Sequence, residues 1–122
     1  MNTKEVAHRL VTMCRQGQYM EAVNELYCDT ISSQEMPGYP DALISGKENV
    51  QKKGQEWMAS VEAFHSAEIS EPMIAGNHFI VKMDLDITFK EKGRQKLEEA
   101  CVYQVKDGKI VNEQFFYDMP EM

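Results

Sequence analysis

Basic residues are outnumbered in this chain of 122 residues, which holds 13 lysines and arginines against 20 aspartates and glutamates. A nucleic-acid surface needs a stripe of positive charge, and an acidic protein is repelled by anionic lipid. The chain also lacks any apolar run near the roughly 18 residues that cross a membrane as a helix. These absences predict no nucleic-acid partner and no membrane partner.

Cysteine is scarce as well, and the three cysteines are Cys14, Cys28 and Cys101. Their odd number and their spacing predict neither a disulfide framework nor a zinc site. The polar N-terminus lacks the hydrophobic stretch of a signal peptide. We therefore expect a cytoplasmic protein whose thiols stay reduced and pack as small apolar groups.

Several catalytic signatures are also missing. The three histidines share no spacing with acids that would form a metal site, and no serine stands in the context of a nucleophile elbow. Cys101 is a poor nucleophile, because neighbouring glutamates raise the pKa of a thiol. The sequence therefore predicts no metal and no cofactor.

Three segments carry the apolar spacing of amphipathic helices. Thr3 is the expected N-cap of the first helix, and Gly17 follows its end. Ser45 and Glu48 have the spacing of a capping box that opens the third helix. Gly54 inside that helix is more simply read as tolerated than as a site of close packing. The expected helices cover residues 3–16, 18–28 and 46–60.

The rest of the chain alternates with the period of β-strands. The cleanest segment is 79–89, where apolar and mostly polar residues alternate, and Asp107-Gly108 between two β-rich runs predicts a long hairpin. Further strands are expected over 29–36 and 62–74, the latter broken near Pro72. We predict one α+β domain over residues 1–122, a cone-like barrel with the helices on a strongly bent antiparallel sheet.

The register of the hairpin decides which side chains share a face. A turn over Lys106, Asp107 and Gly108 with a glycine bulge would place Cys101 opposite Glu113. Glu99 and Glu113 would then be diagonal neighbours, close enough to share a proton. One face of the hairpin would carry Glu99, Cys101, Tyr103, Val111, Glu113, Phe115 and Tyr117.

Four segments in this order resemble a known superfamily. They are Leu-Tyr-Cys-Asp at 26–29, Ile-Ser-Gly-Lys-Glu at 44–48, Val-Lys-Asp-Gly-Lys-Ile at 105–110 and Phe-Tyr-Asp at 116–118. The chain is similar over its whole length to the nuclear-transport-factor-2-like superfamily, in its ketosteroid-isomerase and SnoaL-like polyketide-cyclase branch. The resemblance implies a pocket between sheet and helices, lined by the hairpin face just described, and a homodimer formed through the outer sheet face.

The resemblance also places Glu35 where ketosteroid isomerases have their general-base aspartate. The positions of their donor tyrosine and donor aspartate fall near Leu10 and at Cys101. Because both donors are missing, steroid isomerisation is not expected.

The candidate catalytic groups are therefore Glu113, Glu99 and Glu35, and each could instead be a solvated carboxylate. The candidate ligand contacts are Tyr103, Tyr117, Phe115, Cys101, His65, Trp57 and Met83. His65 could equally be a half-buried histidine satisfied by a neighbour, and Trp57 could be a core residue.

Three functions remain open from the sequence. The first is a cofactor-independent isomerase or cyclase acting on a small apolar carbonyl compound, with a glutamate as base and Tyr103 or Tyr117 as donor. The second is a non-catalytic protein that binds a hydrophobic small molecule in the same pocket. The third is an interaction domain that works through its outer sheet face, where Val102 and Phe116 stand among amides.

Overall fold

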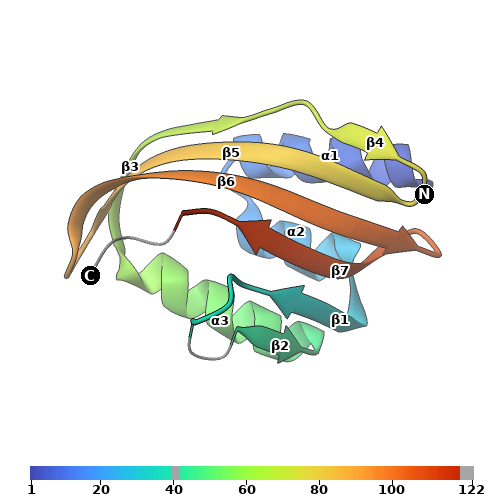
Figure 1. The fold of residues 1–122 in the computed structure, drawn as a ribbon, viewed down its shortest axis with the longest axis horizontal. Coiled ribbons are helices and arrows are strands. Elements are labelled where there is room, and N and C mark those ends of the chain that lie inside the picture. The colour runs from blue at the N-terminus through green and yellow to red at the C-terminus, as the bar shows by residue number, and fades with distance from the viewer. Residues whose placement is uncertain (40–41, 119–122) are drawn as a thin grey trace.

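The computed structural model describes residues 1–39 and 42–118 (Figure 1). Helices pack against a curved sheet, so the α+β class expected from the sequence is confirmed. Figure 1 shows α1 and α2 behind the sheet, while α3 lies beside β1 and β2. The helices are α1 (Thr3–Arg15), α2 (Tyr19–Leu26) and α3 (Lys47–Ser60).

Helix α1 begins at Thr3, as the expected range of 3–16 predicted, and ends one residue earlier, but its N-cap differs. The N-cap is Asn2 rather than Thr3, because Asn2 Oδ1 accepts the Glu5 backbone N–H at 2.8 Å. Glu5 in turn accepts from the Asn2 backbone at 3.0 Å, which completes a capping box. Gly17 has a φ of 74° just past the helix, as its expected role requires.

Helix α2 ends at Leu26, two residues before the expected end, because Tyr27 already belongs to a strand. Helix α3 has no capping box. Ser45 ends strand β2, and the N-cap is Gly46 with a φ of 93° and no side-chain cap.

Gly54 lies where α3 packs closely on α2. A Cβ added at this position would stand 2.8 Å from Met20 Sδ, which is well inside normal packing distance. The interpretation of Gly54 as merely tolerated was therefore wrong.

The sheet has the strand order β2-β1-β7-β6-β5-β3, and β4 pairs with β5. Every pair is antiparallel except β1 and β7, which run parallel, so the sheet is mixed rather than wholly antiparallel. The strands are β1 (Tyr27–Gln34), β2 (Leu43–Ser45), β3 (Val61–Ile69), β4 (Met73–Ala75), β5 (His78–Phe89), β6 (Gly93–Lys106) and β7 (Lys109–Phe116).

The core lies between the concave face of the sheet and the helices. Strand β5 alternates as expected, with Phe79, Val81, Met83, Leu85 and Ile87 buried. Side chains of α1, α2 and β1 complete this core. No helix in the described residues is long and apolar enough to cross a membrane.

The β6–β7 hairpin has a different register from the one expected. Lys106 pairs with Lys109, so the turn has two residues, Asp107 at φ 52° and Gly108 at φ 76°. Two positive φ values in succession are typical of a type I′ turn. As a result, Tyr103 rather than Cys101 lies opposite Glu113.

Beyond a bulge the faces of the hairpin are those expected, despite the shorter turn, but next to the turn Ile110 rather than Val111 is buried. Between the pairs Val105–Ile110 and Gln104–Asn112, Val111 is an extra residue without a partner. This extra residue restores the alternation, so Cys101, Tyr103 and Glu113 all point into the core.

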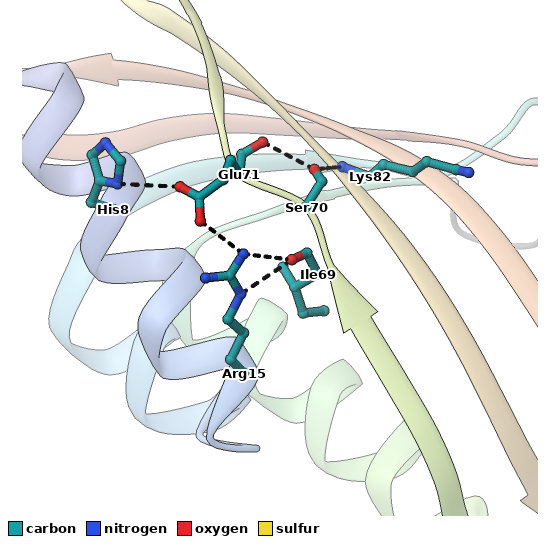
Figure 2. A network of polar contacts seen from close by, with 6 residues as sticks. All are labelled: His8, Arg15, Ile69, Ser70, Glu71 and Lys82. Carbon is teal, nitrogen blue, oxygen red and sulfur yellow. Dashed lines mark hydrogen bonds and ion pairs between the residues drawn. The ribbon is translucent and has the colours of Figure 1, made fainter.

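A polar network ties α1 to the segment between β3 and β4 (Figure 2). Arg15 donates from Nε and Nη2 to the Ile69 carbonyl at 3.1 and 2.8 Å, and from Nη2 to Glu71 at 3.0 Å. His8 Nδ1 lies 4.0 Å from the same carboxylate, and the Ser70 hydroxyl accepts the Lys82 backbone N–H at 2.8 Å. These contacts fix the edge of the sheet against the helix layer.

Candidate functional site

A broad open groove of about 1490 Å³ lies at the end of the sheet away from the β6–β7 turn. Its walls come from α3, the segment after β1, the β5–β6 turn, β6 and the residues at the end of β7. Ligand pockets usually have about 300 to 1,000 Å³, so the groove has room for a small organic molecule and water.

One carboxylate in the groove is held by two donors. Lys53 Nζ on α3 lies 2.7 Å from Glu35 Oε1, and the Tyr117 hydroxyl donates to Glu35 Oε2 at 2.6 Å. The Glu35 side chain is 18% exposed. Burial and the Glu35 carboxylate together hold the pKa of Tyr117 far above its usual range. Glu35 is thus an oriented carboxylate, paired with a cation at the groove wall.

Of the six carboxyl groups among the described groove residues, Glu35 and Glu99 are half-buried and the other four are exposed. Burial, followed by repulsion from Glu35, raises the pKa of Glu99 to about 7, and Lys53 offsets part of this. Near neutral pH, a large fraction of Glu99 therefore keeps its proton and can donate a hydrogen bond. Glu35 and Glu99 have different environments, which is how neighbouring carboxyl groups acquire separate acid and base roles.

Aromatic and aliphatic side chains form the apolar part of the groove. Trp57 packs edge-on against Phe89 with ring centroids 5.9 Å apart, and Leu97 lies on the same wall. Tyr39 packs edge-on against Tyr117 at 5.9 Å. This lining favours an apolar ligand body next to the two carboxyl groups.

Glu113 lies in the core and not among the residues lining the groove. It is 4% exposed and accepts from the Tyr27 hydroxyl and from Ser33 Oγ, the latter at 2.8 Å. Burial raises its pKa to about 6, while the two hydroxyl donors oppose the rise. Glu99 and Glu113 are not the diagonal neighbours that the expected register implied, because Glu113 is opposite Tyr103.

The remaining candidates divide between groove, core and surface. Trp57 and Tyr117 line the groove with Glu35 and Glu99. The core holds Cys101 at 0%, Tyr103 at 2% and Met83 at 7% exposure, and Phe115 is half-buried against them. Burial and then Glu99 raise the pKa of the Cys101 thiol.

His65 is not part of the groove wall. It is exposed on β3, where Nε2 lies 2.6 Å from Thr88 Oγ1 on the neighbouring strand. The pairing of β3 with β5 shifts in register at this position, between Phe64 and Ser66. The structure therefore brings four of the ten candidates together in the groove.

Sequence reasoning missed Lys53, Tyr27 and Ser33. Lys53 stands four residues before Trp57 on α3, so helical spacing alone places both on one face. Tyr27 falls within the helix expected over 18–28. In the structure it begins β1, where its side chain is on the same face of the strand as Ser33. Ser33 carries no signal of its own, because its partner Glu113 reaches it through the parallel pairing of β1 and β7.

The groove brings together the ion-paired carboxyl group of Glu35, the Glu99 carboxyl group with its raised pKa, the Lys53 ammonium group and the Tyr117 phenol. Such a set suits proton transfer at a carbon next to a carbonyl. Among the described residues, no group of three or more histidine, cysteine, aspartate or glutamate side chains is arranged to hold a metal ion.

The chain matches the SnoaL-like domain family over residues 1–117. A solved structure from Mesorhizobium loti, described as a candidate SnoaL-like polyketide cyclase, is 32% identical, with a TM-score of 0.91 over 96% of this chain and 100% of that one. No curated protein matches the chain.

Two more distant structures share the fold alone. One from Xanthomonas campestris, a protein of unknown function with a cystatin-like fold, is 16% identical, with a TM-score of 0.81 over 96% of this chain and 91% of that one. One from Catenulispora acidiphila, with a ketosteroid isomerase-like fold and bound trimethylamine, is 16% identical, with a TM-score of 0.74 over 94% and 86%. The family match and the 32% identity together show that this chain belongs to the SnoaL-like family.

Proposed function

We propose that the groove binds a small apolar carbonyl compound and catalyses isomerase- or cyclase-type proton transfer on it without a cofactor. The observation that carries this proposal is the pair of carboxyl groups in one apolar cleft. Glu35 is paired with Lys53 at 2.7 Å, and Glu99 has a pKa raised to about 7. One group is then a base and the other an acid at the same pH.

The proposed step is enolisation. Glu35 takes a proton from the carbon next to the carbonyl, and the electron pair of that C–H bond forms the C=C bond of the enolate. Glu99 donates a hydrogen bond to the carbonyl oxygen, where the negative charge collects. Return of the proton from Glu35 to a different carbon gives an isomer. In the cyclase-type reaction the enolate carbon instead attacks a second carbonyl and closes a ring, and the alkoxide formed from that carbonyl takes the proton back from Glu35.

Both oxygens of Glu35 have partners in the free protein. Oε1 contacts Lys53 and Oε2 accepts from Tyr117. Substrate therefore displaces the Tyr117 hydroxyl, and Lys53 stays to orient the base. The freed phenol can join Glu99 as a second donor to the oxyanion.

The test is exchange of the carbon-bound protons of apolar ketones into D₂O, followed by NMR. We expect wild type to exchange the protons next to the carbonyl of at least one ketone that also raises the melting temperature. Glu35→Gln should lower the exchange rate at least about 100-fold, since general base catalysis contributes roughly 10²–10⁴. The Glu62→Gln variant, altered at an exposed β3 residue outside the groove lining, should exchange like wild type.

The alternative is a non-catalytic protein that binds a small molecule in the same groove. A binding protein without catalytic activity would be stabilised by ketones in the same way. The carbon-bound protons of these ketones would exchange no faster with wild type than with Glu35→Gln. That result would contradict the catalytic proposal and leave the groove as a binding site. A protein that no ketone stabilises would contradict both, and would favour an interaction domain.

We also propose that two copies associate through the outer sheet face in the cytoplasm. Exposed apolar side chains cross this face, with Met73 paired to Ile80 and Ile80 to Val102 on neighbouring strands. Ile80 is 40% and Phe116 44% exposed. Phe116 also lines the groove, so Met73 and Ile80 are the exposed apolar side chains that support an interface on this face.

A further inference from the structure

Residues 90–96, at the mouth of the groove, carry a local excess of positive charge, although the chain as a whole has a formal charge of −7. Basic residues outnumber the single acid Glu91 between positions 90 and 96, and they are Lys90, Lys92, Arg94 and Lys96. This segment forms the β5–β6 turn and the start of β6. A concentrated charge at the entrance of a cleft attracts ligands of opposite sign.

Three of these four cations line the groove, and of these Lys96 stands opposite Asp86 in the pairing of β5 with β6. Arg94 is held by Asp86 on the outer face at 2.9 and 3.0 Å. Lys90 and Lys92 line the groove, and neither forms an ion pair with another side chain among residues 1–39 and 42–118. Besides Glu35 and Glu99, the acids that line the groove are Glu56, Glu91, Glu98 and Asp118. Glu98 pairs with Lys82, and none of the four pairs with Lys90 or Lys92.

The length of β6 sets the distance between these lysines and Glu99. Along the groove face of β6, Gln95 and Leu97 separate the turn from Glu99. Lys92 directly precedes β6, and the six strand steps from Gly93 to Glu99 span about 20 Å at roughly 3.3 Å each. A lysine side chain reaches back along this path, which leaves room for an apolar body of about ten to twelve carbons beside Trp57 and Leu97.

We propose that the ligand of this groove is an apolar carbonyl compound with an anionic group at its far end, held by Lys90 and Lys92 while the carbonyl lies at Glu99. This inference rests on the proposed function and names its substrate class. An ammonium group binds a carboxylate or a phosphate as a point charge, so the shared chemistry is a terminal anion.

The experiment compares ligands that differ only in the charge of the far end. The probes are 11-oxododecanoate, its methyl ester and 11-oxododecyl phosphate, and calorimetry measures their Kd at low and high salt. We expect wild type to bind the carboxylate about tenfold more tightly than the ester at low salt. The preference should shrink at 0.5 M NaCl, because exposed charges are screened there.

The variant Lys90→Gln/Lys92→Gln should lose the preference while binding the ester like wild type. The matched control is Lys4→Gln/Lys106→Gln, which removes the same charge at two exposed positions outside the groove lining and should keep the preference. Tighter binding of the phosphate than of the carboxylate would support the inference and identify a phosphate ester as the natural head group.

Two results overturn the inference in different ways. Equal Kd values for ester and acid, or a preference that survives in Lys90→Gln/Lys92→Gln, would overturn the anionic head group and leave the proposed function standing. Failure of all three probes to bind wild type would overturn the inference together with the proposed function.

Discussion

Glu99 makes the stability of the fold depend on pH. Its pKa is raised to about 7 from a usual value of 4.5. Between these two pH values the unfolded chain has already lost the proton that the folded protein still binds, so stability falls as pH rises through this window. Below this window Glu99 is protonated in both the folded and the unfolded chain. Above it Glu99 is ionised in both, and the folded protein bears the full free-energy cost of the buried charge.

We expect the free energy of unfolding to fall between pH 5 and pH 8, with about 2 kcal/mol of the loss due to Glu99 after allowance for its contact with water. Glu99→Gln should be more stable than wild type at pH 8 and nearly equal to it at pH 5. Urea denaturation at both pH values measures this. An identical pH dependence in wild type and variant would contradict the assignment.

Ser33 and Tyr27 stabilise the buried carboxylate of Glu113. Each hydroxyl donates to it, and a lost hydrogen bond to a buried charge costs about 1.5–3 kcal/mol. Ser33→Ala should therefore destabilise the protein by about 2 kcal/mol at pH 8, and by less at pH 5, where Glu113, with its pKa of about 6, is protonated.

The control for this prediction is Ser32→Ala, on the same strand but outside the core. Its cost should stay below about 0.5 kcal/mol at both pH values. Equal losses in the two variants would mean that the hydroxyl–carboxylate contact contributes nothing.

At the scale of elements, Gly54 sets the approach of α3 to α2. Gly54→Ala should change stability little, because a gain of about 1 kcal/mol in helix propensity offsets a small shift of the flexible Met20 side chain. Gly54→Leu should cost about 2 kcal/mol through overpacking.

The double variant Gly54→Leu/Met20→Ala measures the contact itself. It should be more stable than the sum of the single changes implies, because the shortened Met20 removes the clash. Additive losses would show that the two helices do not meet at this position.

Most helices and strands could be predicted from the sequence. Strand register and the contacts between elements were harder to predict. Strand β5 followed from its alternation, and the hairpin turn followed from Asp107-Gly108. The residue without a partner, Val111, carries no local signal, because a bulge is decided by what packs on the two faces. The sequence could place Glu99 on a pocket wall. It could not show that Glu113 lies in the core instead of the pocket, or that Lys53 contacts Glu35, because both depend on how distant segments pack together.

At the scale of the whole molecule, the proposed dimer tests the role of the outer sheet face. Met73→Glu and Ile80→Glu place a charge where each copy would bury an apolar side chain, so both should shift the protein toward monomer in light scattering. Leu43→Glu, at a residue that is 61% exposed on the edge strand β2, should leave the mass unchanged. A monomeric wild type at high concentration would contradict the proposed dimer.

The central claim is that Glu35 and Glu99 are a base and an acid set apart by their surroundings. ¹³C NMR titration of the glutamate side-chain carboxyls measures this directly. We predict that Glu99 titrates near pH 7, and that Glu35→Gln lowers the Glu99 pKa by removing the repulsion of the neighbouring carboxylate. A Glu99 that titrates near 4.5 in wild type, with no response to Glu35→Gln, would contradict the account.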